Sequence, residues 1–269
     1  MKRCIRLYKV LVAQFLKTIM QSRLDFLVGL IGFFLVQISG VVFLYLIFRQ
    51  IPNLQGWSFE QLVFIYGFAQ IPRGIDHLFT DNIWKIAWFK IVEGEFDRYM
   101  LRPMNLLFQI ISEEIQPDAL GELLVGFILV ISSLSKGIIV VDGVHILLFI
   151  VSIIAGALIY TAIKLFFATI AFWIKISGPF VYLAYQTSDF AKYPIEIYAK
   201  VIRFVITWII PFAFVAYLPA SYFLGVGNIL FKEASAMIIG IEVLIAIVFC
   251  IIAYSFFLIG TKCYESSGN

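Results

Sequence analysis

An all-α polytopic membrane protein with six transmembrane helices is the fold that this 269-residue sequence predicts. Hydrophobic residues make up 62% of the chain and charged residues 14%, against the ~25% charged residues of a water-soluble domain. Apolar runs long enough to cross the hydrocarbon core of a bilayer recur along the chain, with short polar segments between them. We expect a single transmembrane domain over residues 1–269.

The chain begins with a basic amphipathic segment, residues 1–23, in which Lys and Arg alternate with apolar residues. This pattern predicts a helix in the cytoplasmic interface of the membrane, with its charges toward the lipid headgroups. A basic cytosolic tail is the alternative. Lys9 and Lys17 interrupt the apolar run, so we do not expect a cleaved signal peptide.

Six segments have the length and composition of crossings, although Lys, Ser, Gly and Pro cluster at Trp173–Pro179 and make the fifth one short. The crossings are 27–48, 59–79, 118–135, 144–172, 176–190 and 236–260. Between the last two, prolines break residues 193–225 into short pieces, which predicts re-entrant helices on the outer side. Alternatively residues 201–225 span the membrane, which would place the C-terminus outside.

The distribution of basic residues orients the chain. With the N-terminus in the cytosol, fourteen of the 20 Lys and Arg residues fall inside and six outside. The positive-inside rule therefore places both termini in the cytosol.

No motif on the chain predicts catalysis. The sequence contains no GxxxxGK[ST] phosphate-binding loop, no GxSxG elbow and no HExxH. Its three cysteines, Cys4, Cys250 and Cys263, form no metal-binding spacing. We expect no catalytic residue, no metal site and no nucleic-acid partner.

Four of the charged residues inside predicted crossings are candidate intramembrane charges: Arg73, Asp76, Glu122 and Glu242. Charges at membrane depth are costly and often functional. Arg73 and Asp76 are three residues apart, so they share a helix face and could pair. The alternative is that both lie exposed at the cytosolic end of the second crossing.

Glu114, Asp118 and Glu122 recur every four residues, which predicts an acidic stripe on one helix face. The stripe could relay cations or protons. The alternative is a solvated cytosolic face with Glu122 pointing into the protein.

The segment 82–103, between the second and third crossings, combines apolar periodicity with four charges at Glu93, Glu95, Asp97 and Arg98. We expect two short amphipathic helices joined at Gly94 and ended by Pro103. Such a segment can lie against the membrane and present charges to a cytosolic protein. An ordinary interfacial loop is the alternative.

Several stretches resemble ABC exporter permeases of the type-2 class (ABC-2), and more narrowly a bacterial subgroup with an LRP signature. The stretches are GEFDRYMLRPMNLL (94–107), IAFWIKIS (170–177), YPIEIY (193–198) and IPFAFVAYLPASYFLG (210–225). The resemblance covers the chain from the N-terminal amphipathic helix to the last crossing.

The resemblance implies a six-helix permease that pairs with a second permease and with two cytosolic ATPase subunits, which hold ATP and Mg. It makes residues 1–23 the connecting helix and 193–225 the helices that roof the translocation path, with Tyr193, Pro194, Pro211, Phe212 and Pro219. The coupling helix falls within 82–103, and the residues expected to contact the ATPase are Gly94, Glu95, Phe96, Asp97, Arg98, Tyr99, Leu101 and Arg102.

We therefore expect an exporter subunit of a bacterial cytoplasmic membrane that moves an amphiphilic drug, peptide or lipid. The partner permease could be a copy or a relative of this chain. The main alternative is an ion-coupled secondary transporter that uses the membrane-embedded acidic residues, and a non-transporting membrane subunit is a further one.

Overall fold

The computed structural model describes residues 23–139, 142–228, 230 and 233–266. These residues form helices and turns and no β-strand; one isolated bridge joins Leu54 and Trp57. The interfacial helix predicted over 1–23 lies outside the described residues, except for Arg23. The longer helices are α2 (Arg23–Phe48), α3 (Phe59–Thr80), α5 (Leu106–Glu113), α6 (Leu120–Ser135), α7 (Gly143–Thr169), α9 (Gly178–Ser188) and α12 (Met237–Lys262).

Short helices fill the connections between these elements. They are η1 (Asp81–Ile83), η2 (Ile86–Lys90, a π-helix), α4 (Asp97–Met100), η3 (Pro117–Ala119), α8 (Ala171–Ile174), η4 (Asp189–Lys192), η5 (Ile195–Ile197), α10 (Lys200–Phe204), η6 (Val205–Ile209, a π-helix), η7 (Phe212–Phe214) and α11 (Tyr217–Phe223).

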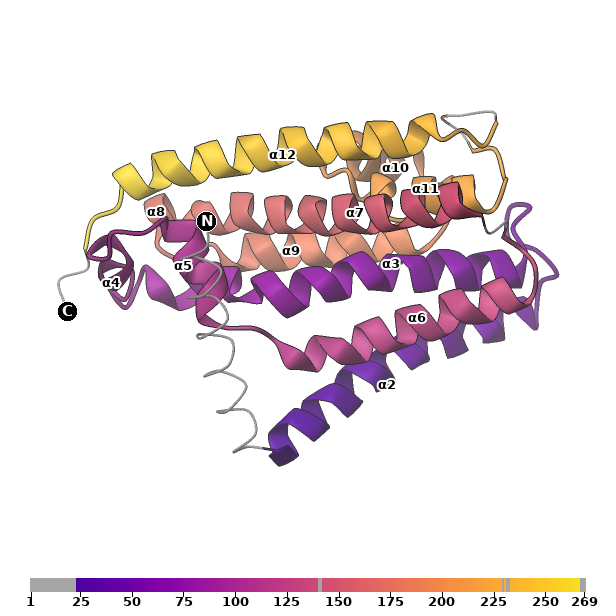
Figure 1. The fold of residues 1–269 in the computed structure, drawn as a ribbon, viewed down its shortest axis with the longest axis horizontal. Helices are drawn as coiled ribbons and strands as arrows, with labels where there is room; N and C mark the ends of the chain where they lie inside the picture. The colour runs from indigo at the N-terminus through magenta and orange to yellow at the C-terminus, as the bar shows by residue number, and fades with distance from the viewer. Residues whose placement is uncertain (1–22, 140–141, 229, 231–232, 267–269) are drawn as a thin grey trace.

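Helices α3 and α7 form the centre of the bundle. Half of the apolar stretch of α7 is buried, compared with 11% of that of α2. Helix α12 packs along α7, α6 packs along α3, and α2 lies outside α6 (Figure 1). The exposed side chains of α2 and α12 are largely apolar, as expected of surfaces that face lipid.

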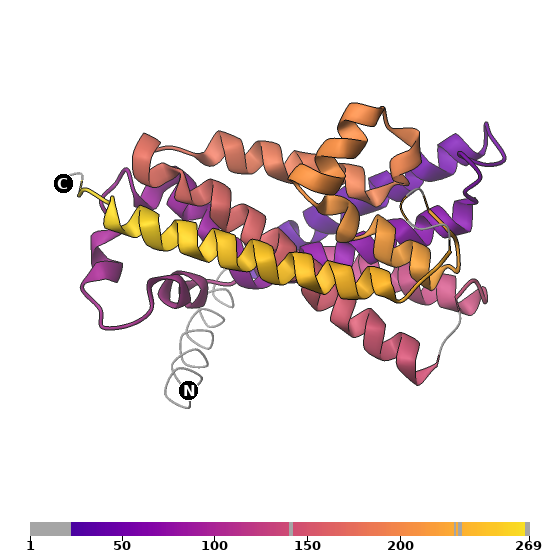
Figure 2. The same ribbon diagram turned by 90° about the horizontal axis from the view of Figure 1, so that it is seen from above.

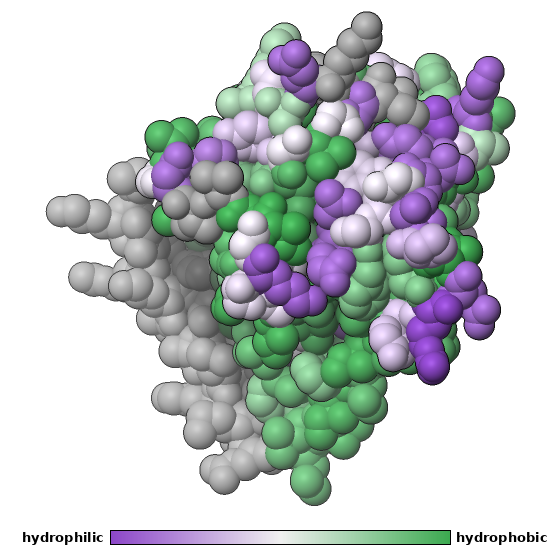
Figure 3. All heavy atoms as spheres, turned by 90° about the vertical axis from the view of Figure 1, so that its right-hand side faces the viewer, coloured by the Kyte–Doolittle hydropathy of each residue, from purple (hydrophilic) through white to green (hydrophobic). Residues whose placement is uncertain are grey.

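The two ends of the bundle differ. Helices α4, α5 and α8 and the C-terminal end of α12 lie at one end, whereas α11 and the turn between α2 and α3 lie toward the other (Figures 1 and 2). Viewed onto this second end, hydrophilic side chains gather across the upper part and apolar side chains cover the part beneath (Figure 3). This polarity agrees with a bundle whose long axis crosses the membrane.

Local sequence signals set where several helices begin. Ser58 and Gln61 form a capping box at the start of α3, with each side chain accepting a hydrogen bond from the backbone N–H of the other. Asn105 and Asp142 cap α5 and α7 by accepting the N–H groups of Phe108 and His145, at 2.9 and 2.8 Å.

Glycines allow α6 to pack closely on both of its neighbours. A Cβ atom at Gly126 would lie 3.1 Å from the carbonyl oxygen of Gly67, so α3 and α6 cross glycine against glycine. A Cβ atom at Gly121 would lie 2.7 Å from the carbonyl oxygen of Leu30, where α6 meets α2.

The predicted crossings correspond to helices, but not to six equal spans. Among the described residues, four stretches are long and apolar enough to cross: Phe26–Phe48, Pro117–Ser135, Gly143–Ile174 and Met237–Lys262. The second predicted crossing is α3, a full-length helix with buried polar residues. The fifth, predicted over 176–190, contains only the 11-residue α9, which covers ~16 Å of a ~30 Å core. The count of six crossings therefore stays a prediction.

The proline-rich segment is bent, as the re-entrant prediction requires. Lys200–Ile209 and Phe212–Phe223 meet at 74°, with Pro211 at the break. Read as one span, this pair would raise the count of crossings to five.

Filling the contact between α2 and α6 tests this packing. We expect Gly121→Ala to lower the apparent melting temperature in detergent by several degrees, because the new methyl group displaces the α2 backbone at a cost of about 1–3 kcal/mol. Gly240→Ala in α12 is the matched control, since no atom lies within 4 Å of a Cβ atom there. Equal melting temperatures for the two variants would contradict the tight contact.

Candidate functional site

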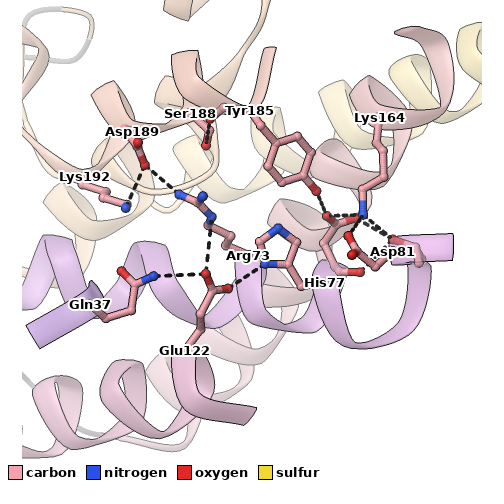
Figure 4. Close-up of polar contacts among 12 residues, drawn as sticks. Gln37, Arg73, His77, Asp81, Glu122, Lys164, Tyr185, Ser188, Asp189 and Lys192 are labelled. Carbon is pink, nitrogen blue, oxygen red and sulfur yellow. Dashed lines mark hydrogen bonds and ion pairs between the residues drawn. The ribbon is translucent and has the colours of Figure 1, made fainter. Parts of the chain in front are cut away.

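Eight charged or titratable side chains meet inside the bundle, and we call them the buried charge network (Figure 4). Helix α3 contributes three of them, and η1, α6, α7 and η4 contribute the rest. The members are Arg73, Asp76, His77, Asp81, Glu122, Lys164, Asp189 and Lys192. Because an unpaired charge is costly at membrane depth, this network determines which helix faces can meet.

The inner half of the network joins α3 to α7 and α9. The ammonium group of Lys164 lies 2.9 Å from Asp76 and 3.2 Å from Asp81, and the side chains of Lys164 and Asp76 are 0% exposed. The Asp76 carboxylate also accepts hydrogen bonds from Tyr185 of α9 and, at 2.6 Å, from Thr80. Thr161 of α7 donates a further one at 2.8 Å.

The outer half is built around Glu122 of α6, whose side chain is 1% exposed. Gln37 of α2 donates to its Oε1 at 3.1 Å, and Nδ1 of His77 lies 2.9 Å from Oε2. Arg73 lies 3.7 Å from the same carboxylate and donates to Asp189 at 2.6 Å. Lys192 is also paired with Asp189, at 2.8 Å.

This geometry corrects the expectation that Arg73 and Asp76 pair with each other. Each pairs instead with a distant residue, Arg73 with Asp189 and Asp76 with Lys164. Neither lies exposed at the end of the crossing, because both are enclosed by α6, α7 and α9. Lys164 and Asp189 were missed as partners, although a lone Lys inside a long apolar run is itself a signal of a buried ion pair.

The predicted acidic stripe is wrong as a continuous surface. Helix α5 ends at Glu113 and α6 begins at Leu120, so Glu114 is not on the helix that carries Glu122. Glu114 pairs with Lys85 near α5, whereas Glu122 lies in the buried charge network. The stripe prediction assumed one uninterrupted helix across Pro117.

Glu242, the remaining candidate acid, lies apart from the network. Its side chain is buried between α12 and α7, where Ser152 donates a hydrogen bond to Oε2 at 2.6 Å. Its Oε1 has no partner among the described residues.

The segment 82–103 forms the predicted pair of short helical pieces, η2 and α4, joined at Gly94. Gly94 has a φ of +69°, a left-handed conformation that favours glycine. Phe96 and Tyr99 point inward: Phe96 packs against Phe172 and Tyr264, each with ring centroids 5.0 Å away, and Tyr99 donates to Glu113 of α5. Two of the residues expected to contact a partner are therefore anchors of the segment.

The outward face of the same segment is charged and apolar at once. Arg98, Leu101 and Arg102 are exposed, and the side chain of Leu101 is 85% exposed. Arg98 pairs with Glu95 at 3.2 Å, and Asp97 accepts a hydrogen bond from Ser266 at 2.6 Å.

The segment is also bonded to the start of α9. The N–H of Ser177 donates to the carbonyl of Ala87 at 2.9 Å, and the indole of Trp88 lies directly against Gly178. A displacement of η2 would therefore be felt at α9, and through Tyr185 at the buried charge network.

The predicted roof residues lie mostly inside the protein. Pro194, Pro211, Phe212 and Pro219 are buried and Tyr193 is half-buried. The fold holds this region through Arg203, which donates to the carbonyls of Ile195, Glu196 and Tyr198, and through Tyr217, which donates to Glu196.

Comparison with known families decides what kind of protein carries these features. The family described as "ABC-2 family transporter protein" matches residues 34–268. The chain belongs to this family. No curated protein and no solved structure was found to match it.

The chain is thus the membrane permease of an ABC-2 transporter, a protein of transmembrane transport. ABC-2 permeases act with ABC ATPase partners, and the membrane domains of the family are typically non-catalytic. In this ABC-2 permease the buried charge network and the segment 82–103 are the two places where chemistry concentrates.

Removing one member of the inner ion pair tests the network. We expect Lys164→Met to destabilise the ABC-2 permease by about 3–5 kcal/mol, because Asp76 is left buried without its cation. Asp76→Asn in the same protein should restore part of the loss. Unfolding in mixed micelles measures both, and a double variant as unstable as the sum of the single ones would contradict the direct pairing.

The pH dependence of stability tests the anchor at Glu113. Burial alone would raise the pKa of Glu113, but hydrogen bonds from Tyr99, Lys90 and Asn82 outweigh it and lower the pKa below its usual range. A lowered pKa stabilises the fold above the ordinary pKa, and this contribution is lost as the pH falls through the lowered value. We expect Glu113→Gln to lower the melting temperature at pH 7 and to shrink its fall toward pH 3. The exposed Glu265→Gln should match the wild type.

Proposed function

We propose that this permease is one half of the membrane part of an ATP-driven exporter, in which two ATPase subunits drive two permeases. Each ATPase engages the segment 82–103, which we therefore call the coupling segment. ATP and Mg are held by the ATPases. The substrate is an amphiphilic drug, peptide or lipid.

The geometry of the coupling segment is the observation that supports this proposal. Its inner residues Phe96 and Tyr99 fix it to α5, to α8 and to the C-terminal end of the chain. Its outer residues Arg98, Leu101 and Arg102 remain exposed for a partner. A segment that is rigid inside and exposed outside can transmit a push from an ATPase to the helices behind it.

A hollow beside the coupling segment suits such a contact. It measures about 460 Å³, and side chains of both charges line it. The lining residues are Lys85, Phe89, Lys90, Glu93, Glu95, Arg98, Glu113 and Glu114. We propose that a charged side chain of the ATPase enters it.

The path for substrate runs along the face that α2, α3 and α9 share with a second permease, which is a copy or a relative of this chain. With the coupling segment in the cytosol, both termini are cytosolic and the α10–α11 region closes the path on the outer side. We place the protein in the cytoplasmic membrane of a bacterium.

The ion-coupled alternative draws less support. Three of its candidate acids already have partners, because Glu114 pairs with Lys85, Glu122 lies between His77 and Arg73, and Asp118 accepts from Gln116. Membership of the ABC-2 family favours transport powered by an ATPase.

Copurification tests the assembly. The permease, tagged at its N-terminus and extracted in mild detergent, should carry with it a stoichiometric ATPase with a GxxxxGK[ST] motif, together with a second permease or a second copy. Absence of an ATPase even after crosslinking would contradict the proposal.

Charge reversal tests the coupling site. We expect Asp97→Lys with Arg98→Glu to reduce ATP-driven substrate efflux from vesicles at least tenfold while ATP hydrolysis persists. The matched control is Glu60→Lys with Lys136→Glu, because this exposed pair, 3.9 Å apart, lies toward the opposite end of the bundle. Unchanged efflux in the Asp97 and Arg98 variant would show that the ATPase engages another surface.

A further inference from the structure

A groove between α2 and α3 leads to the outer half of the buried charge network. Its volume is about 360 Å³, which is within the ~300–1,000 Å³ of small-molecule sites. The α2 wall is mostly apolar and the floor is polar. The lining residues are Gly29, Gly32, Phe33, Val36 and Gln37 on α2, Arg73 and His77 on α3, and Glu122 on α6.

Of the two imidazole nitrogens of His77, one has a hydrogen-bond partner among the described residues and the other has none. Nδ1 faces Glu122 at 2.9 Å, and Glu122 also receives a hydrogen bond from Gln37 and the charge of Arg73. The hydrogen bond from Gln37 and the charge of Arg73 favour the ionised carboxylate, so Nδ1 carries the hydrogen that lies between His77 and Glu122. Nε2 then has a lone pair and no hydrogen-bond partner among the described residues, in a ring that lines the groove.

Acidic and aromatic side chains surround His77. Glu122 of α6 and Asp76 of α3 both act on the ring, Tyr185 of α9 stacks on it with centroids 5.2 Å apart, and Arg73 shares Asp189 with Lys192. In the network as a whole, four carboxylates face three cations: Asp76, Asp81, Glu122 and Asp189 against Arg73, Lys164 and Lys192. With His77 neutral, the network as a whole has one positive charge too few, and the surplus carboxylate belongs to Asp76 and Asp81, which share Lys164.

Two features near the groove suit a cation attached to an apolar chain. The rings of Phe33 and His77 pack edge to face with centroids 6.2 Å apart, so an aromatic ring lies beside the imidazole. At the other end, the carboxylate of Asp118 lies directly against Gly29. Among the described residues, no atom outside the backbone of α2 lies within 4 Å of a Cβ atom built at Gly32, which leaves space for an alkyl chain along α2.

We infer that this groove binds an amphiphilic amine, whose ammonium group donates a hydrogen bond to Nε2 of His77 and whose alkyl part lies along Phe33 and Val36. The ammonium group supplies the missing positive charge. A proton on Nε2 would supply the same charge, so the amine and the proton compete, and the proton leaves to solvent when the amine binds. The inference rests on the proposed function, because it specifies the head group of the amphiphilic substrate.

Binding to the intact permease complex in nanodiscs of phosphatidylcholine tests this. The probe is a dansyl-labelled alkyl diamine with one free primary amine, followed by fluorescence anisotropy. Competition between the amine and one proton for Nε2 predicts binding severalfold tighter at pH 8 than at pH 5.5, while the amine stays protonated throughout. Probes that end in a trimethylammonium, hydroxyl or carboxylate group are the matched comparisons, and each should bind at least fivefold more weakly at pH 8.

Two variants localise the effect. His77→Gln should bind the amine severalfold more weakly at pH 8 and lose the pH dependence. His145→Gln, which changes the other histidine near the opposite end of the bundle, should leave both unchanged. If His77→Gln does not fold, the pH dependence and head-group order of the wild type still decide the question.

The outcomes separate the possibilities. Tighter binding of the carboxylate probe, or equal binding of the amine and hydroxyl probes, overturns the inference. Loss of probe binding in nanodiscs of phosphatidylethanolamine would identify a lipid amine as the occupant, and retained binding would favour a free substrate. If the ATPase copurifies and the amine does not bind, only this inference fails; if the amine binds and no ATPase copurifies, only the proposed function fails.

Discussion

The fold depends on neutralising the charges that α3 carries into the membrane. Arg73, Asp76 and His77 lie within two turns of one central helix, and each needs a partner that no neighbour on that helix provides. The partners come from α6, α7 and η4, so these elements can pack on α3 only in the register that brings Glu122, Lys164 and Asp189 inward. Apolar packing in a bilayer selects the register of helices only weakly, because an apolar side chain gains little by exchanging contact with lipid tails for contact with leucine.

The same constraint connects the interior to the end of the bundle that carries the coupling segment. Tyr185 binds Asp76 in the network, and the helix that carries it starts at residues bonded to Ala87 and packed on Trp88. The short α9 is therefore fixed at both ends, to the coupling segment and to the buried charges. Its 11 residues cover about half of a ~30 Å hydrocarbon core, and they bridge the surface where an ATPase is proposed to act and the place where charge is concentrated.

Much of this arrangement could be predicted from local sequence. Apolar runs mark α2, α6, α7 and α12 because lipid imposes a length and a composition on a crossing, and Gly94 marks the joint in the coupling segment because few residues adopt its backbone conformation. The pairing of Arg73 with Asp189 and of Asp76 with Lys164 could not be predicted from local sequence. Each pair joins residues about 90–120 positions apart and depends on tertiary packing. The acidic stripe failed for a local reason, because the chain leaves the helical path between Glu113 and Pro117.

The end of the chain has a practical bearing on how the protein is handled. Tyr264 packs on Phe96, and the hydroxyl of Ser266 reaches Asp97, so the tail that follows α12 is part of the platform from which the coupling segment projects. A fluorescent protein or purification tag fused after this tail would emerge beside the surface that is proposed to contact the ATPase, and would obstruct it.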